Sequence, residues 1–400
     1  MNAYCPQAYT IPGINAMQTD SPSVLPLAPL PLAPGGAKAV DLHCDGGRLS
    51  SDAGLVLLRD PDEPRGFTRA LAAVLKDPRA PRRVDFTLHD LLQQRVLQMA
   101  AGYEEANDAT PRRDAPICQL RLDRLPESGP PLASPPTLSR FANRVARTDL
   151  YRMALALLHP FLASSAPPPK GIVLDVDDTE DPVHGGPDQA RFDGYEGGYG
   201  FLPFHVYAGL SGRLSTTILK AKRCTGAQRL SVLKRMVKRL RHAWPDTLLL
   251  LRGDRPFASP EVRQWLAAQA HLHSVTGLTR KAVLQQLAHE GVAQAKRAYE
   301  RAGGKVTRLH STRYQAQTWS RPRRVVIKVE VSEPGVHTRF VVTDREQART
   351  TVLYQKIYGA RGQAENEMKD HKVSLKSDRT SCHRFEANQF RGWLHAAASV

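Results

Sequence analysis

Two carboxylates in this sequence follow directly after apolar segments that are typical of buried strands. Asp177 follows residues 171–174 within the run Asp-Val-Asp-Asp-Thr, and Asp254 follows residues 247–251. If these segments belong to one sheet, the strand ends carry both carboxylates into a common cleft. Carboxylate oxygens are the ligands that hard cations such as Mg²⁺ prefer. The pattern therefore predicts a divalent-cation site, although a solvated acidic loop would leave the same pattern at Asp177.

A third candidate group lies in a segment predicted to be helical. Tyr358, Arg361, Glu365 and Lys372 occur at positions i, i+3, i+7 and i+14. At roughly 100° per residue they fall within about 60° of arc on one helix face. Such a face suits an active-site wall in which Glu365 binds metal and the two cations neutralise phosphates. The alternative is an exposed face on which Arg361 and Glu365 form an ordinary i,i+4 pair.

Asp175 supports a different interpretation of the first acidic segment. Four apolar residues followed by Asp-x-Asp-x-Thr resemble the first motif of haloacid dehalogenase-like phosphatases. In that case Asp175 would be the nucleophile and Asp177 the general acid/base. Asp254 would also fit, but those enzymes need a further Asp shortly afterwards, and residues 255–259 contain none.

The elements that would position these residues form an α/β pattern over residues 170–400. Period-two and helical spacing predict strands at 171–174, 201–210, 214–219 and 247–251 and a helix at 227–244. Further strands, at 324–331 and 338–343, predict a β-rich insertion at about 260–348. The apolar residues 394–398 form a helix that reaches Val400 without a polar cap, so we expect a truncated C-terminus.

Residues 39–163 are predicted to form a small, mainly helical domain. Apolar residues recur with helical spacing between 87 and 101, and Gly102 is placed to end that helix. Pro135 opens another helix, which carries several arginines. This basic domain suits DNA binding, while a structural cap with a solvated charged face would look similar. Residues 1–38 are proline-rich, which predicts a disordered tail.

The composition favours a polyanionic partner. The chain has 400 residues, with 56 Lys and Arg against 39 Asp and Glu, and a net charge of +17. The length suggests two or three folded units. The five cysteines are scattered, which favours a reducing compartment over a disulfide framework or a zinc knuckle. No apolar run approaches the roughly 18 residues of a membrane span, so we expect a cytoplasmic protein without a membrane partner.

The helix group resembles a known signature. The spacing Tyr-x2-Arg-x3-Glu-x6-Lys is similar to that of bacterial insertion-sequence transposases with a DDE catalytic centre, and Asp177-Asp178-Thr179 lies where that class carries Asp-Gly-Thr. Asp254 resembles its second acidic ligand, although Pro256 replaces an expected small residue. The resemblance covers about residues 40–400. It extends to the insertion-sequence family numbered thirteen-eighty through residues 45–54, 102–108, 132–140, 319–321 and 339–343.

This resemblance implies an RNase H-like catalytic domain with a β-rich insertion between the second Asp and the Glu. It assigns catalysis and metal binding to Asp177, Asp254 and Glu365, and DNA contacts to Tyr358, Arg361 and Lys372. The implied cofactor is Mg²⁺, with Mn²⁺ as a substitute. The implied reaction cuts at terminal inverted repeats and joins the 3′ ends to target DNA. Double-stranded DNA is then the partner, bound by a dimer, and the protein associates with the nucleoid.

Two other functions stay open at this point. A catalytically decayed transposase would bind DNA without cutting it, and binding would survive loss of all three carboxylates. The phosphatase would depend on Asp175 and not on Glu365. Replacement of Glu365 therefore separates an active transposase from both alternatives.

Overall fold

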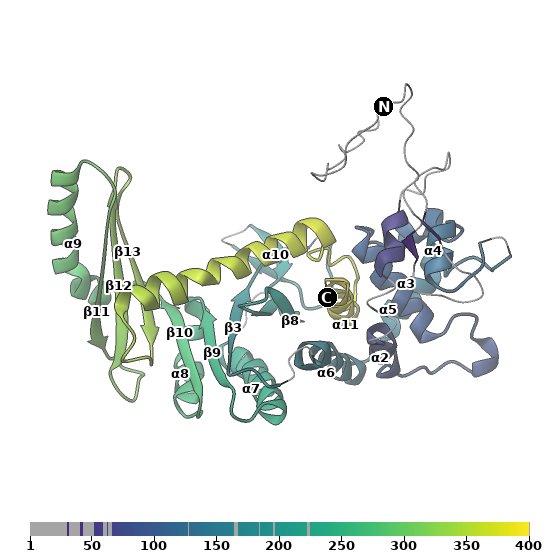
Figure 1. Ribbon diagram of the computed structural model, residues 1–400, viewed down its shortest axis with the longest axis horizontal. Helices are drawn as coiled ribbons and strands as arrows, with labels where there is room; N and C mark the ends of the chain where they lie inside the picture. Colours follow the sequence, from purple (N-terminus) through teal and green to yellow (C-terminus); the bar gives the residue numbers. More distant parts are fainter. Residues whose placement is uncertain are drawn as a thin grey trace, which may run out of the picture.

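The computed structural model describes residues 30–31, 41–42, 52–58, 62, 66–126, 128–163, 167–183, 185–194, 197–221 and 225–399. A helical unit and a mixed α/β unit lie side by side along the long axis of the molecule (Figure 1). Most of the segment 1–38, which we expected to be a disordered tail, lies outside the described residues. Strand β1 (Leu30–Pro31) of this segment pairs antiparallel with β2 (Asp41–Leu42), which follows it.

The helical unit consists of several short helices and a few longer ones. Its N-terminal elements are η1 (Ala53–Leu58), α2 (Phe67–Ala73), η2 (Pro81–Arg83), α3 (Leu88–Ala100), η3 (Ala106–Arg112), α4 (Pro116–Arg121), α5 (Pro135–Arg144) and α6 (Arg147–Ala163). The helix predicted at 87–101 is α3. Thr87 and Asp90 form a capping box at its start, and Gly102, with φ 83°, follows its end.

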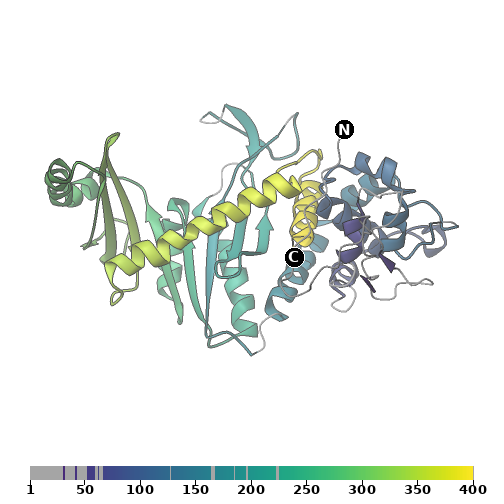
Figure 2. The ribbon, with the colours of Figure 1, turned by 45° about the horizontal axis from the view of Figure 1, so that its top comes forward.

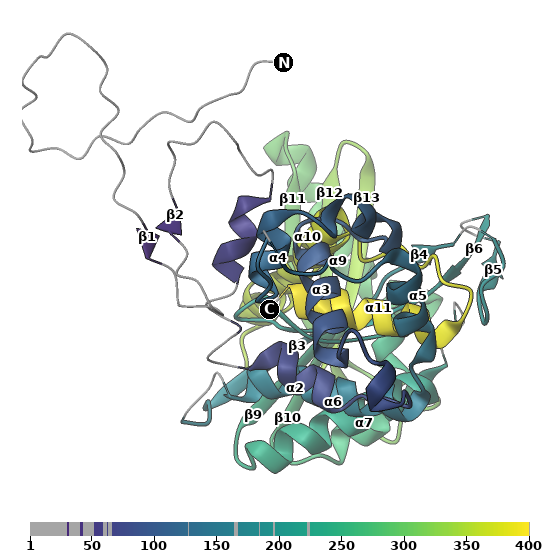
Figure 3. The same ribbon diagram turned by 90° about the vertical axis from the view of Figure 1, so that its right-hand side faces the viewer.

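The core of the helical unit contains a helix from the other end of the chain. Phe390 and Trp393 of α11 (Phe385–Ala398) are buried among α3, α5 and α6. The rings of Phe390 and Phe141 pack edge to face, with centroids 5.1 Å apart. Figure 3 shows α11, in yellow, behind the N-terminal helices. The helical unit therefore includes residues far outside the range 39–163 that we assigned to it.

The α/β unit is built on one eight-stranded sheet, in the order β11-β12-β13-β10-β9-β3-β7-β8. Strands β3, β9 and β10 are parallel, and the other neighbouring pairs are antiparallel. The strands are β3 (Gly171–Asp178), β7 (Phe204–Ala208), β8 (Arg213–Ile218), β9 (Leu248–Gly253), β10 (Leu272–Leu278), β11 (Val306–Tyr314), β12 (Arg323–Ser332) and β13 (Gly335–Thr343). A small second sheet has the order β4-β6-β5, with β4 (Asp181–Pro182), β5 (Arg191–Asp193) and β6 (Gly198–Phe201).

Helices cover both faces of the large sheet because its strands alternate apolar side chains between the faces. On one face, Val206 and Leu249 pack with α7 (Gly226–Ala243) and α8 (Pro260–Ala267). On the other, Tyr207 packs with α10 (Gly362–Leu375). Figure 2 shows α10 crossing the sheet toward the helical unit.

The segment at about 260–348, which we expected to be a β-rich insertion, is continuous with the central sheet. It begins with α8 and β10, and β10 pairs in parallel with β9. Helix α9 (Ala282–Ala302) then packs on the antiparallel strands β11 to β13. Strand β13 pairs with β10, so these strands widen the sheet on which the two aspartates lie. Among the described residues, no helix has the length and apolar character needed to cross a membrane.

Candidate active site

Alternation along β3 separates its three aspartates between two faces of the sheet. Asp178 faces α7, where its carboxylate accepts from Arg229 Nε at 2.8 Å and pairs with Nη2 at 2.6 Å. Asp175 and Asp177 lie on the opposite face, toward α10. Asp178 therefore forms an ion pair with Arg229 on the face of the sheet that α7 covers. Asp177 is the residue that faces the helix group.

Asp254 comes directly after the neighbouring parallel strand, as predicted. In the β3–β9 register, Val176 is opposite Gly253, which places Asp177 next to Asp254 at the same edge. A side chain at Gly253 would collide with Val176 and Phe257, so glycine permits this close approach. Pro256 lies in the first turn of a short helix, η4 (Arg255–Ala258), where proline needs no backbone donor.

The helix group lies on a segment whose winding changes twice. Residues Val352–Tyr358 form a π-helix (η5), Gly359–Arg361 a 3₁₀ turn (η6), and Gly362–Leu375 the regular helix α10. The segment is helical, as predicted, but its winding becomes regular only at Gly362. Despite this, Tyr358 donates its hydroxyl to Asp254 Oδ1 at 3.2 Å. Departures of this kind from α-helical winding are frequent at functional sites.

Arg361 joins all three carboxylates that the sequence singled out. Its Nη2 lies 3.3 Å from Asp177 Oδ2 and 3.1 Å from Asp254 Oδ1, and its Nη1 lies 2.7 Å from Glu365 Oε1. The guanidinium is buried, with 7% of the Arg361 side chain exposed, whereas Glu365 is half exposed. Three carboxyl groups from separate parts of the chain thus converge on one cation.

Burial perturbs the ionisation of this cluster. It raises the pKa of Asp177 to about 7, and the nearby charge of Asp254 adds to that rise while Arg361 opposes it. Burial also raises the pKa of the Tyr358 phenol above its ordinary value, with a further contribution from Asp254. Tyr358 is therefore a neutral hydrogen-bond donor near neutral pH. Carboxylates that repel one another in this way are suited to share a cation.

The three carboxylates carry the oxygen donors that a hard divalent cation prefers, but the Arg361 guanidinium lies between them. Within the described part of the chain, no group of three or more His, Cys, Asp or Glu side chains is close enough to hold a metal ion. The three carboxylates nonetheless all contact the Arg361 guanidinium. Their oxygens are the donors that Mg²⁺ and Mn²⁺ prefer. A metal ion there would have to replace part of the contacts that Arg361 now makes.

Lys372, the last member of the helix group, lies apart from this cluster. It is about two helical turns beyond Glu365. Its Nζ pairs with Asp181 Oδ1 at 2.9 Å and donates to the Glu180 carbonyl at 2.5 Å. Asp181 is buried, and burial raises the pKa of its carboxyl to about 6 against the lowering effect of Lys372. Lys372 therefore anchors α10 to β4 in this conformation.

Comparison with known proteins identifies the family. A sequence model of the family described as "Transposase DDE domain group 1" matches residues 32–400. This chain belongs to that family. Among solved structures it is similar to a piggyBac transposase in a synaptic complex with hairpin DNA, with a TM-score of 0.49 and 12% identity over 85% of this chain and 74% of that one. No curated protein matches the chain.

Membership of the DDE transposase family supports a transposase and argues against the phosphatase alternative. The position of Asp175 argues against it too. Asp175 is 1% exposed, and both of its carboxylate oxygens are bound by Arg252, at 2.6 Å to Nε and 2.5 Å to Nη2. A nucleophile must reach its substrate, and this carboxylate is enclosed.

Sequence reasoning considered Asp175 only as a nucleophile and missed its pairing with Arg252 below the candidate site. Arg252 occurs two residues before Asp254, and Asp175 occurs two residues before Asp177. Because side chains alternate along a strand, this spacing alone places both pairs on one face. The register then sets Asp175 directly opposite Arg252. The period-two spacing was available in the sequence, whereas the pairing of the two strands was not.

Proposed function

We propose that this transposase is encoded by a bacterial insertion sequence and belongs to the family numbered thirteen-eighty. It cuts DNA at the terminal inverted repeats of its own element and joins the freed 3′ ends to target DNA. Its catalytic domain is RNase H-like and is formed by β8-β7-β3-β9-β10 with α7, α8 and α10. The observation that carries this proposal is the convergence of Asp177, Asp254 and Glu365 on Arg361.

Asp177, Asp254 and Glu365 are the residues that would hold two Mg²⁺ ions. The chemistry such ions supply is activation of an attacking oxygen and stabilisation of the leaving 3′-oxygen. Tyr358 keeps Asp254 oriented through its hydroxyl, and its buried neutral phenol is a donor rather than a nucleophile. Arg361 holds the three carboxylates together in this structure and is proposed as a contact to DNA phosphate.

Lys372 is proposed as a further phosphate contact. Its ammonium group donates to the Glu180 carbonyl and forms an ion pair with the Asp181 carboxylate, and a lysine has three N–H donors with which it could also contact a phosphate oxygen. This arrangement fixes the ammonium group in place, which reduces the side-chain entropy lost when DNA binds. Double-stranded DNA is the partner that the net charge of +17 favours.

The helical unit is the proposed reader of the inverted repeats. Exposed arginines lie along α5 and α6, among them Arg140, Arg147 and Arg152. Because two transposon ends have to be cut and joined together, the active assembly on DNA is proposed to be a dimer. A protein that binds the chromosome in this way would be associated with the nucleoid.

The test is Mg²⁺-dependent cleavage of a labelled duplex that carries the terminal repeats of the element. Glu365→Gln removes one carboxylate charge and keeps the side-chain shape. Glu367→Gln is the matched control, because Glu367 lies on the same helix and its carboxylate contacts Gln363. We expect cleavage at the repeat boundary to be lost in Glu365→Gln and kept in Glu367→Gln.

The other possible outcomes of this cleavage assay would support the alternative functions. Equal cleavage by both variants would show that Glu365 is not a catalytic ligand. Binding of the duplex without cleavage by the wild-type protein would identify a decayed transposase that acts only as a DNA-binding protein. Gel-shift titrations on the same duplex make that distinction.

A further inference from the structure

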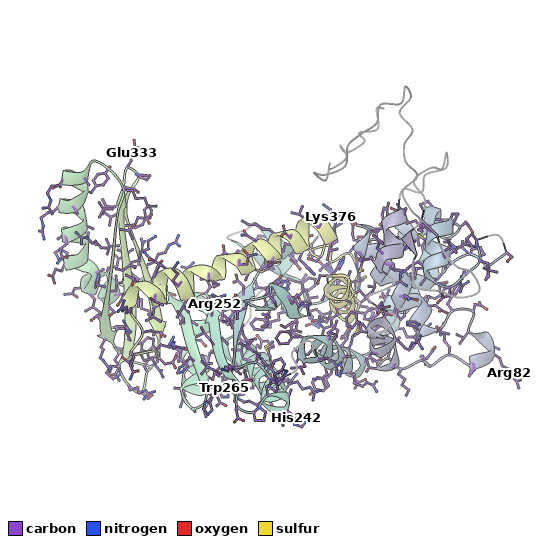
Figure 4. All side chains as sticks on the ribbon, viewed as in Figure 1. Arg82, His242, Arg252, Trp265, Glu333 and Lys376 are labelled. Carbon is purple, nitrogen blue, oxygen red and sulfur yellow. The ribbon has the colours of Figure 1, made fainter. Side chains whose placement is uncertain are left out.

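The pair formed by Asp175 and Arg252 connects the catalytic strands to the helix that carries Tyr358. Both side chains are buried, with 1% and 3% exposed. The Arg252 guanidinium binds Asp175 through two nitrogens and uses its third, Nη1, to donate to the Ile357 carbonyl at 2.8 Å. Figure 4 shows Arg252 in the central sheet beneath the helix that crosses it.

The contact with Ile357 falls where the helix changes its winding. Ile357 is near the end of the π-helix, and the 3₁₀ turn starts at Gly359. Regular i to i+4 bonding is interrupted at such a change, so an external donor can fix the local backbone. The next residue is Tyr358, whose hydroxyl contacts Asp254, and Arg361 follows one turn later.

We propose that the Asp175–Arg252 pair is a positioning unit for the active site, in which Arg252, fixed by Asp175, holds the Ile357 carbonyl and so places Tyr358 and Arg361 against the carboxylates. The inference rests on the proposed catalytic role of Asp177, Asp254 and Glu365. Each member of the pair precedes one of these aspartates by two residues on the same strand face, so the unit joins β3, β9 and the helix directly below the cluster.

A role in stability alone does not explain this arrangement. A buried ion pair loses much of its Coulomb energy to desolvation, and apolar replacement of both partners is often neutral or stabilising. The absence of a side chain at Gly209, on the adjacent strand end, also leaves room for the pair. A methyl group at Gly209 would collide with Asp175 Oδ2 and Arg252 Nη2. Gly209→Ala therefore offers a way to displace the pair without changing either partner.

The main test replaces both partners, as Asp175→Val with Arg252→Met, so that no buried charge is left unpaired. Thermal unfolding should show a folded protein, while the turnover rate of end cleavage falls between about tenfold and a hundredfold at nearly unchanged KM for the duplex. The position of Tyr358 is followed by ¹⁹F NMR of protein labelled with 3-fluorotyrosine. The Tyr358 resonance, identified with Tyr358→Phe, should shift or broaden while the other tyrosine resonances stay in place.

Two single variants and one control complete the experiment. Arg252→Lys keeps the charge opposite Asp175 but lacks the fork that also reaches Ile357, so its Tyr358 resonance and turnover should resemble those of the double variant. Gly209→Ala should move the same resonance. Arg263→Met removes a buried guanidinium that binds Thr276 at 2.8 Å, and it should leave the Tyr358 resonance in place.

The inference would be overturned if the Tyr358 resonance stayed unshifted in all three proteins: the double variant, Arg252→Lys and Gly209→Ala. Wild-type turnover in all three would overturn it as well. If the double variant does not fold, the two single variants decide by the same readouts. Continued cleavage by Asp177→Asn and Glu365→Gln would refute the proposed function instead. The ¹⁹F measurement needs no activity, so it tests the positioning claim in either case.

Discussion

Replacing His371 by leucine should change how the stability of this protein depends on pH. His371 lies on α10, between His205 of β7 and His395 of α11, with 6.5 Å between ring centroids on either side. Burial lowers the pKa of His371 from 6.5 to about 4; the nearby backbone of His395 opposes this, and the charge of Lys372 contributes to the lowering. The folded protein therefore keeps the imidazole neutral at a pH where the unfolded chain protonates it.

This difference in proton binding sets the direction in which the free energy of unfolding changes with pH. Below pH 6.5 the unfolded state binds a proton that the folded state refuses, so stability falls as the pH falls. The loss amounts to about 1.4 kcal/mol at pH 5.5 and about 3 kcal/mol at pH 4, and it levels off below the folded pKa. His371→Leu removes this proton from both states and should lose the corresponding part of the acid sensitivity.

The measurement is urea unfolding of wild type and variant at several pH values between 7.5 and 4. Only the difference between the two proteins is diagnostic, because other groups also titrate in this range. Asp181 has a pKa raised to about 6 by burial, so its protonation favours the folded state as the pH falls. Burial lowers the pKa of His205 and of His395, and both add acid sensitivity of their own.

A matched control for replacing a histidine by leucine is His289→Leu, at an exposed position of α9. This variant should keep the acid sensitivity that His371→Leu loses. If His371→Leu differs from wild type by the same free energy at every pH, His371 is not held neutral by burial and the reasoning is wrong.

Three further predictions concern the metal site and the helical unit. Asp177→Asn should weaken Mn²⁺ binding at least tenfold in calorimetry without DNA, since it removes one of three carboxylates around Arg361; equal affinities would exclude Asp177 as a ligand. Phe390→Ala should cost about 3–5 kcal/mol in urea unfolding, because Phe390 is fully buried in the core of the helical unit, and a loss below about 1 kcal/mol would contradict that packing. Thr87→Ala should cost about 1 kcal/mol through loss of the capping box of α3, and unchanged stability would show that this cap contributes nothing.

Local spacing predicted the parts of the site that depend on one segment. Side-chain patterns within single segments predicted that β3 ends at the aspartates and that Asp254 follows β9. They also predicted that Tyr358, Arg361 and Glu365 share one side of their helix. These features need no knowledge of which segments pair. In this segment Arg361 and Glu365 still meet, although the winding before Gly362 is not α-helical.

The rest depends on partners that are distant in the sequence. Lys372 has the spacing of an active-site residue, yet Asp181 holds it away from the other members of the helix group. The contact of Arg252 with Ile357 joins residues 105 positions apart, and no local pattern indicates it. Likewise α11 has an apolar pattern that would fit either unit, and only the packing assigns it to the helical one.

The position of α11 has a consequence for folding during synthesis. The apolar surface of α3, α5 and α6 is complete only when Phe390 and Trp393 are present, and Arg147 of α6 meets Glu386, which lies 239 residues later. Helices α3, α5 and α6 are synthesised well before α11, so their apolar faces stay exposed until α11 has been made. A fragment that ends before residue 385 would keep these faces exposed permanently, and the N-terminal unit should aggregate when it is expressed without α11.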